Sequence, residues 1–565
     1  MPSKSKYSDW SKEDLIKRVD ALEKRKKYGL VWDEERTKEK FEAVAEGKLP
    51  VLKEVKSKEI NTDPEKPTHI LIEGDNYHAL SVLNYTHEKA VDVLYFDPPY
   101  NTGAKDWKYN NDYVDRNDQW RHSKWISMMY KRLLIAKRLL KNNGVLLVAI
   151  DDHEVHNLRH ILNDIMGENN YIATICIEVN PAGQNIRDNS PAISHDYCLI
   201  YARKIDEAVI IPRALTADEA KSFKEKDDKG YYLWDNLRRR GGNSTPKDRP
   251  GQWFPLFVNK ATGKISLSNF SGAVKIWPID PKGTKRIWRV NPDGFLREFE
   301  EGNISIIEKA KRIEIVKKSY LPEGRLPKTL WKDGKYSATS YGTKLLLDVL
   351  GKNVFNYPKS LYLVLDCLKY WAKPDSVVLD FFAGSGTTGH AVLELNKIDN
   401  GNRKFILCTN NENNICTDVC YPRIQKVIKG YKNSSGKKID GLSGNLKYFK
   451  TSFAPSAPTD KNKELLTKES VEMLCLRENT FDFVSETDTY KIFKNNEHYT
   501  GIIFDQLSIP KFKKEASKLN KSVSVYVFSL GDDDFSEEFA DLKNKIKVCS
   551  IPEAILRVYR RIFKS

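Results

Sequence analysis

The chain has 565 residues, 40% of them hydrophobic and 11% aromatic, so it is too long for one hydrophobic core and too apolar for a disordered protein. Its 93 Lys and Arg residues against 77 Asp and Glu residues give a formal net charge of +16. This charge suits a polyanionic partner such as nucleic acid, although a solvated Lys-rich surface would give the same excess. No run approaches the roughly 18 to 20 apolar residues of a membrane helix, and the N-terminus lacks the apolar core of a signal peptide. We therefore expect a cytoplasmic protein without membrane contact.

The first 60 residues are polar and charged, with Leu15, Val19 and Leu22 at the spacing of an amphipathic helix. From residue 69 to residue 203, short apolar runs alternate with helical stretches. The predicted strands are 69–74, 91–97, 144–152, 171–179 and 195–203, and the longest predicted helix is 122–141. Alternation at this spacing predicts a parallel sheet covered by helices.

After residue 203 the chain becomes rich in Gly, Pro, Trp and basic residues, which indicates an inserted, irregular α+β domain. A strand, a Gly-rich turn and a helix return at 376–397, and another strand follows at 404–411. We therefore expect five regions. They are an N-terminal helical region (1–60), the first half of an α/β domain (61–204), an inserted domain (205–335), the second half of the α/β domain (336–453) and a C-terminal α/β domain (454–565).

The segment 94-LYFDPPYNTG-103 ends a predicted buried strand with an acid and two prolines. Pro98 and Pro99 fix their φ angles and lack backbone N–H groups, so the segment cannot continue as a central strand. We expect a rigid loop that carries Asp97 and Tyr100 at the carboxyl end of a strand, where open α/β sheets bind ligands.

The turn 380-DFFAGSGTTGHAV-392 contains the GxGxxG pattern of a glycine-rich ligand loop. A phosphate-binding loop of an NTPase is excluded, because His390 and Ala391 stand where that loop needs Lys and Ser or Thr. A dinucleotide site remains open locally, because Glu412 lies where such sites place an acid. That interpretation leaves Asp380 and the Asp-Pro-Pro-Tyr loop without a role.

Two clusters have residue types that bind metals. Cys416 and Cys420 form a CxxxC with Cys408 nearby, but no second Cys pair or His cluster follows. The run 151-DDHEVHNLRH-160 contains HExH, which fails the HExxH pattern of metalloproteases. We expect buried thiols in the first case, a helix surface in the second, and no metal.

Taken together, GDN at 74–76, DPPY at 97–100 and DFFAGSGTT at 380–388 closely resemble the motifs of S-adenosylmethionine-dependent methyltransferases that act on DNA amino groups. The catalytic loop precedes the cofactor loop in the chain. The segment 106-DWKY-109 follows the catalytic loop. This permuted order resembles the β-class DNA amino-methyltransferases, especially the modification (Mod) subunits of type III restriction–modification systems. The resemblance is strongest over 70–205 and 350–450. It implies an α/β, Rossmann-like methyltransferase fold with an inserted target-recognition domain and a C-terminal α/β domain.

The resemblance also implies a role for each motif. Asp97 and the Pro98 carbonyl would accept the two N–H bonds of the target amine, and Pro99 would keep the loop rigid. Tyr100 would stack on a base flipped out of the duplex. An Asp at the first position points to adenine N6, because cytosine-N4 members usually carry Ser there. The residues expected to bind S-adenosylmethionine, and its product S-adenosylhomocysteine, are Asp75, Asp380, Phe381, Ala383, Gly384, Ser385, Gly386, Thr387, Thr388 and Glu412.

In the same family, the insert recognises the target sequence in double-stranded DNA. The residues expected to contact DNA are Asn101, Arg238, Arg239, Arg240, Lys247 and Arg249. The family further implies a homodimer, a restriction (Res) helicase–nuclease partner and a bacterial, nucleoid-associated location. The alternatives are a solitary adenine or cytosine-N4 methyltransferase without a restriction partner, and a non-catalytic DNA-specificity subunit.

Overall fold

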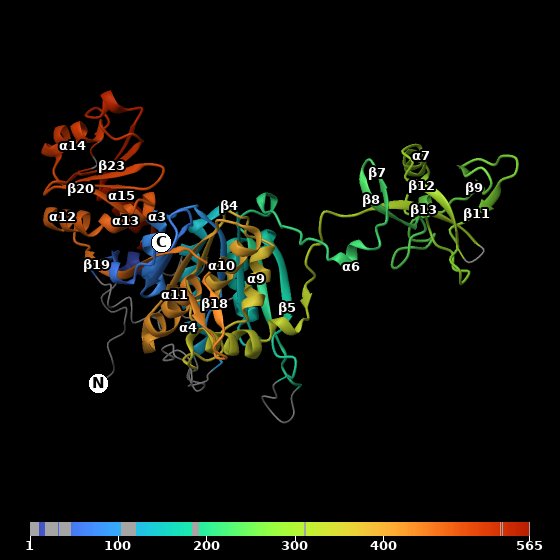
Figure 1. Ribbon diagram of the computed structural model, residues 1–565, viewed down its shortest axis with the longest axis horizontal. Coiled ribbons are helices and arrows are strands. Elements are labelled where there is room, and N and C mark those ends of the chain that lie inside the picture. The colour runs from blue at the N-terminus through green and yellow to red at the C-terminus, as the bar shows by residue number, and fades with distance from the viewer. Residues whose placement is uncertain are drawn as a thin grey trace. The chain divides into compact units, whose positions relative to one another are not determined.

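The computed structural model describes residues 11–16, 32, 47–102, 120–183, 191–309, 312–531, 533 and 535–563. It contains two compact units (Figure 1). The first combines residues 1–211 with 328–565, and the second comprises residues 212–327. Most of the predicted N-terminal helix, including Val19 and Leu22, lies outside the described residues, as does the segment 106–109.

A ten-stranded mixed sheet forms the centre of the first unit. Six neighbouring strands, from β19 to β4, are parallel, whereas β1, β6 and β5 each run antiparallel to a neighbour. In spatial order the strands are β1 (Lys48–Glu54), β19 (Asn445–Pro455), β2 (Thr68–Glu73), β16 (Lys404–Thr409), β15 (Val377–Asp380), β3 (Val91–Phe96), β4 (Leu140–Ile150), β6 (His195–Ala202), β5 (Tyr171–Glu178) and β14 (Leu330–Trp331). Two strands of the second half, β16 and β15, therefore lie between β2 and β3 of the first half.

Helices cover both faces of this sheet, as its nearly continuous apolar strands require. Along β3, Leu94 and Phe96 pack into one core, while Val93 and Tyr95 pack into the other. The first core is covered by α3 (Asn76–Thr86), α4 (Arg121–Leu139) and α5 (Val155–Met166), and the second by α8 (Lys344–Leu350), α9 (Leu361–Lys369), α10 (Thr387–Asp399) and α11 (Tyr421–Lys429). The predicted Rossmann-like α/β fold is confirmed.

The boundaries between regions differ from the expected ones. Residues 48–54 were expected in an N-terminal helical region, but β1 pairs with β19 and buries Val51 and Leu52. Residues 205–211 and 328–335 were expected in the insert, but they remain with the sheet: β14 pairs with β5, and the Ile211 amide donates to the Tyr370 carbonyl. Long-range strand pairing, which local patterns do not report, sets these limits.

The C-terminal region forms a five-stranded sheet in the order β20 (Asp482–Glu486), β21 (Tyr490–Lys494), β22 (Tyr499–Ile503), β23 (Val523–Phe528) and β24 (Ile546–Ile551). Its helices are α12 (Asp460–Glu469), α13 (Val471–Glu478), α14 (Ile509–Ala516) and α15 (Glu553–Phe563). Both α13 and α15 pack against α3, and the Tyr559 hydroxyl donates to the Pro50 carbonyl at 2.5 Å. This region is therefore part of the first compact unit.

The insert has its own small core, built on Leu237, Trp288, Phe295 and Ile315. A four-stranded sheet contains β12 (Ile304–Lys309), β13 (Arg312–Tyr320), β8 (Gly230–Asn236) and β7 (Glu225–Asp227), and a three-stranded sheet contains β10 (Lys264–Ser266), β9 (Leu256–Asn259) and β11 (Val274–Ile276). Its helices are α6 (Ala217–Ala220) and α7 (Pro292–Glu300).

In the part of the chain described here, no helix is long and apolar enough to cross a membrane.

Candidate active site

Three predicted acids meet at one edge of the large sheet. Asp75 follows β2, Asp380 ends β15 and Asp97 follows β3. Because β2, β16, β15 and β3 are parallel neighbours, their carboxyl ends lie side by side. The arrangement brings the predicted catalytic loop of the first half next to the glycine loop of the second half.

The glycine loop turns sharply between β15 and α10. Gly384 and Gly386 have φ angles of 49° and 77°, in the left-handed region where a side chain is strained. Asp380 lies buried beneath this loop and accepts hydrogen bonds from the Phe382 amide (2.9 Å) and the Thr388 hydroxyl (2.5 Å). Burial raises the pKa of Asp380 to about 7, although these hydrogen bonds favour its carboxylate.

The edge of the sheet offers acceptors suited to a polar, cationic ligand. Both hydrogen-bond donors to Asp380 are neutral, so neither balances the charge of its carboxylate. A bound cation beside Asp380 would supply that balance and would favour the ionised form. At the end of β16, the Thr409 hydroxyl and the Asn410 side-chain oxygen are buried without a hydrogen-bond partner among the described residues. These groups fit the ammonium and sulfonium charges and the adenosine hydroxyl and amino groups of the predicted cofactor.

The buried Arg423 of α11 positions the glycine loop. Its guanidinium donates to the Thr387 hydroxyl at 2.8 Å and to the Ser385 hydroxyl at 3.2 Å. The side chains of these two predicted cofactor residues are therefore engaged within the protein. That Ser385 and Thr387 bind the cofactor stays a prediction, which the backbone of the loop could fulfil.

The turn after β2 is tied to the same loop. Asn76 donates from its side-chain amide to the Phe381 carbonyl at 2.8 Å. Asp75 caps α3 by accepting from the Tyr77 amide, and its carboxylate lies 3.4 Å from the buried guanidinium of Arg132. Glu412 lies beyond β16 at the same edge, in a single helical turn (Glu412–Asn414).

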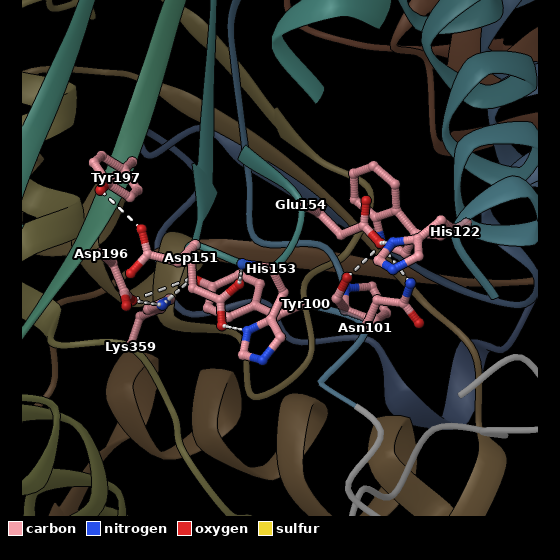
Figure 2. A network of polar contacts seen from close by, with 12 residues as sticks. Tyr100, Asn101, His122, Asp151, His153, Glu154, Asp196, Tyr197 and Lys359 are labelled. Carbon is pink, nitrogen blue, oxygen red and sulfur yellow. Dashed lines mark hydrogen bonds and ion pairs between the residues drawn. The ribbon is translucent and has the colours of Figure 1, made fainter. Parts of the chain in front are cut away.

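The predicted catalytic loop carries Asp97 into a cluster of charged and polar groups. Tyr100 is buried, and its hydroxyl lies 3.3 Å from Asp196 of β6. The Lys359 ammonium contacts that hydroxyl, lies 2.6 Å from Asp196 Oδ2 and 3.6 Å from Asp97 Oδ1. Figure 2 shows Tyr100, Asp196 and Lys359 converging at this point. Asp97 Oδ1 is buried and accepts no hydrogen bond from any described residue.

The other end of the loop is held by two helices. The Trp125 indole of α4 donates to the Pro99 carbonyl at 2.6 Å. This hydrogen bond does not use the neighbouring Pro98 carbonyl. Asn101 has a left-handed φ of 59° and is only 3% exposed. Its amide donates to the buried Glu154 at 2.5 Å, and Glu154 also contacts His122 (Figure 2). The Asn101 side chain is therefore enclosed and orients the loop, while its contact with DNA stays a prediction.

Residues 91–419 match the sequence model of a family described as DNA methylase. The chain belongs to this DNA methylase family. Family membership confirms the prediction of a DNA methyltransferase.

Curated relatives of the DNA methylase include both type II and type III enzymes. The chain is 33% identical to the type II methyltransferase M.KpnI of Klebsiella pneumoniae over 67% of its own length and 87% of that protein. It is 32% identical to the EcoPI Mod subunit of Escherichia phage P1, over 64% of this chain and 60% of that protein. For the StyLTI Mod subunit of Salmonella typhimurium the identity is 31%, over 60% of this chain and 52% of that protein. The matches thus span little more than half of these two Mod subunits.

Sequence patterns missed several residues of the methylase site. Lys359 and Asp196 lie in segments that resemble the family, 356-NYPKSLYL-363 and 195-HDYCLIYAR-203, but nothing in either segment links it to Asp97. Glu154 belongs to a run expected to be a helix surface, and His156 and His160 are indeed exposed there. Glu154 is fully buried, and its carboxylate is compensated by hydrogen bonds from Asn101, His122 and Asn157.

The predicted DNA-contacting residues of the insert differ in exposure. Arg238 is 6% exposed, pairs with Glu314 at 3.2 Å and donates to the Ile279 carbonyl at 3.0 Å. These bonds use the Arg238 guanidinium within the insert, and its contact with DNA stays a prediction. Arg240, Lys247 and Arg249 are exposed. Beside Arg238, a cavity of about 670 Å³ is walled in part by Arg239, Arg240 and Lys282.

The three cysteines around the predicted CxxxC lie in the hydrophobic core. Cys408, Cys416 and Cys420 are free and buried, and burial raises the pKa of each thiol. Among the described residues, no group of three or more His, Cys, Asp or Glu side chains could hold an ion. These cysteines serve as small apolar core residues of the methylase.

Proposed function

We propose that this DNA methylase transfers a methyl group from S-adenosylmethionine to N6 of adenine in double-stranded DNA, acting on a flipped-out base. The observation that carries the proposal is Asp97 Oδ1, a buried acceptor without a hydrogen bond, next to the Asp380 glycine loop. When bound, S-adenosylmethionine supplies an electrophilic methyl group on its sulfonium.

The chain's own residues prepare the nucleophile. The amino group of adenine is conjugated to the ring and is a poor nucleophile. Asp97 and the Pro98 carbonyl accept its two N–H bonds, which draws the nitrogen toward a tetrahedral geometry and frees its lone pair. Trp125, through the Pro99 carbonyl, and Glu154, through Asn101, hold the loop in this geometry. A duplex base reaches the loop only after flipping.

Mass spectrometry of nucleosides tests this reaction. The purified protein is incubated with S-adenosylmethionine and DNA from a host without DNA methylation, and the digested DNA is analysed. We expect N6-methyladenine. N4-methylcytosine would instead establish the alternative target, and DNA without either product would contradict the proposal.

The wider assignment is to a type III restriction–modification system. The similarity to the EcoPI and StyLTI Mod subunits supports this assignment. The assignment includes a homodimer and a Res helicase–nuclease partner in the bacterial cytoplasm. A solitary methyltransferase remains the second candidate, because the type II enzyme M.KpnI matches over 87% of its length. A type III enzyme is expected to copurify with a coexpressed Res subunit, whereas a solitary enzyme is not.

Affinity for S-adenosylmethionine is expected to depend on pH through Asp380. Its pKa of about 7 means that acid protonates it, while a bound cation favours the carboxylate. Affinity should therefore fall roughly tenfold from pH 7.5 to pH 6. Isothermal titration calorimetry measures this change. In Asp380→Asn, affinity should be weak and nearly flat over the same range, and an unchanged pH dependence would exclude Asp380 as its source.

Two arginines of the insert are expected to respond differently to alanine. Arg240→Ala should weaken DNA binding and lower the slope of log Kd against log salt by about one, as for one lost phosphate contact. Arg238→Ala should instead destabilise the insert by about 3 kcal/mol, because Glu314 loses its buried partner. Fluorescence anisotropy at several salt concentrations and thermal unfolding separate the two outcomes. Equal salt slopes for Arg240→Ala and wild type would remove Arg240 from the interface.

A further inference from the structure

Lys359 connects the second half of the chain to the catalytic loop of the first. It lies in the turn between α8 and α9, and its side chain is 13% exposed. The backbone of this turn is held tightly against Gly342, where an added Cβ would lie 2.1 Å from the Pro358 carbonyl oxygen. This close packing of Pro358 against Gly342 fixes the backbone from which the Lys359 side chain extends.

The ammonium of Lys359 is close to two carboxylates at different distances. It lies 2.6 Å from Asp196 Oδ2, which is hydrogen-bonding distance, and it also contacts the Tyr100 hydroxyl (Figure 2). Its distance to Asp97 Oδ1 is 3.6 Å, too long for a hydrogen bond but short for an ion pair. The Lys359 ammonium therefore stabilises the negative charge of Asp97 electrostatically, while the lone pairs of Asp97 Oδ1 remain available to accept a hydrogen bond.

We infer that Lys359 is a positioning residue of methyl transfer: anchored by Asp196, its ammonium keeps Asp97 ionised without occupying the oxygen that accepts the target amine. The inference rests on the proposed function of Asp97. Lys359 acts through Asp97 and is not expected to bind the cofactor.

The charges around Asp97 make the lysine necessary. Asp196 of β6, Asp380 of β15 and Asp151 after β4 are acidic neighbours in the same cluster, and Tyr100 contributes a neutral phenol. Burial raises the pKa of Asp97 to about 6 even though Lys359 lowers it. Without the ammonium, the pKa of the Asp97 carboxyl would rise further, since only the Tyr100 hydroxyl would then oppose the effects of burial and of Asp196.

Protonation of Asp97 would weaken its function. A neutral acid keeps one carbonyl acceptor, but its other oxygen donates, and it lacks the negative charge that stabilises the positive charge developing on the amine of adenine. Asp196 determines where the ammonium sits. If Asp196 were neutral, Lys359 would be free to move onto Asp97 Oδ1 and to occupy the acceptor site.

The test measures the single-turnover rate of DNA methylation against pH, together with cofactor affinity. For Lys359→Met, the acid limb of the profile should shift upward by about one unit or more, so that the rate falls roughly tenfold at pH 5 and about twofold or more at pH 7. Lys359→Arg should recover most of this shift, because it keeps the charge. Asp196→Asn should lower the plateau rate and move the acid limb to lower pH. Cofactor affinity should stay unchanged in all three variants, which also reports that they are folded.

Lys335→Met is a matched control. Lys335 pairs with Asp366 at 2.7 Å, and Tyr336 donates to the same carboxylate at 2.9 Å, so this Lys–Asp–Tyr group repeats the chemistry away from Asp97. Its pH profile should equal that of the wild type. A Lys359→Met profile with a lower rate but an unmoved acid limb, or one matched by Lys335→Met, would overturn the inference. A wild-type protein that methylates no DNA would instead contradict the proposed function itself.

Discussion

Replacing Asp97 by alanine is expected to lower the rate of methyl transfer by about 10³-fold or more, because it removes a preorganised acceptor from the amine as charge develops on nitrogen. The carboxylate lies beside the cofactor loop but outside it. Affinity for S-adenosylmethionine should therefore be retained, with a small gain near neutral pH, because Asp97 raises the pKa of Asp380. Single-turnover methylation and calorimetric titration measure the two quantities.

Asp97→Asn serves as the companion variant. It keeps the shape of the side chain and one carbonyl oxygen, so it should be less damaged than Asp97→Ala while remaining far below the wild type. Full activity in Asp97→Ala would show that the amine is activated by some other group. Loss of cofactor binding would show that the variant had disturbed the glycine loop.

Gly386→Asp is expected to weaken binding of S-adenosylmethionine by about 100-fold or more. Its φ of 77° strains any side chain, at roughly 1–2 kcal/mol. A Cβ there would lie 3.1 Å from Cys420 Sγ, a tight contact that requires Cys420 or the loop to move by a few tenths of an ångström. The added carboxylate would also repel the carboxylate of the cofactor's amino-acid end. Calorimetric titration at pH 7.5 measures the loss.

Gly351→Asp controls for backbone strain alone. Gly351 has the same φ of 77°, but it ends α8 at the surface with no atom within 4 Å of an added Cβ. It should be destabilised to a similar extent and bind the cofactor like the wild type. If both variants lost affinity equally, strain and not the loop would be responsible.

The predicted strands and the two motif loops follow from local patterns. Apolar runs bounded by Gly, Pro and Asp marked β2, β3, β15 and β16, and prolines after Asp97 marked the end of a strand. Their meeting at one edge follows from the parallel order, which short apolar strands separated by helices already indicate.

The remaining features depend on contacts between distant residues. β1 was not foreseen as a sheet strand because its partner, β19, lies about 400 positions away. Lys359 meets Asp97 only after the two halves interleave, so no spacing pattern could reveal the pair. The run of three arginines predicts a DNA contact for Arg238 as for its neighbours, but its partner Glu314 comes from β13, far along the chain. Charge alone does not distinguish a buried ion pair from a surface that binds DNA.

The central claim, sequence-specific methylation of adenine N6, is tested most directly in a living genome. The protein is expressed in a host that lacks adenine methylation, and the genome is read by single-molecule sequencing that detects modified bases. N6-methyladenine in one short motif is the predicted result, and marks on one strand of an asymmetric motif would favour the type III assignment. An unmodified genome in cells that contain folded, cofactor-binding protein would contradict the account.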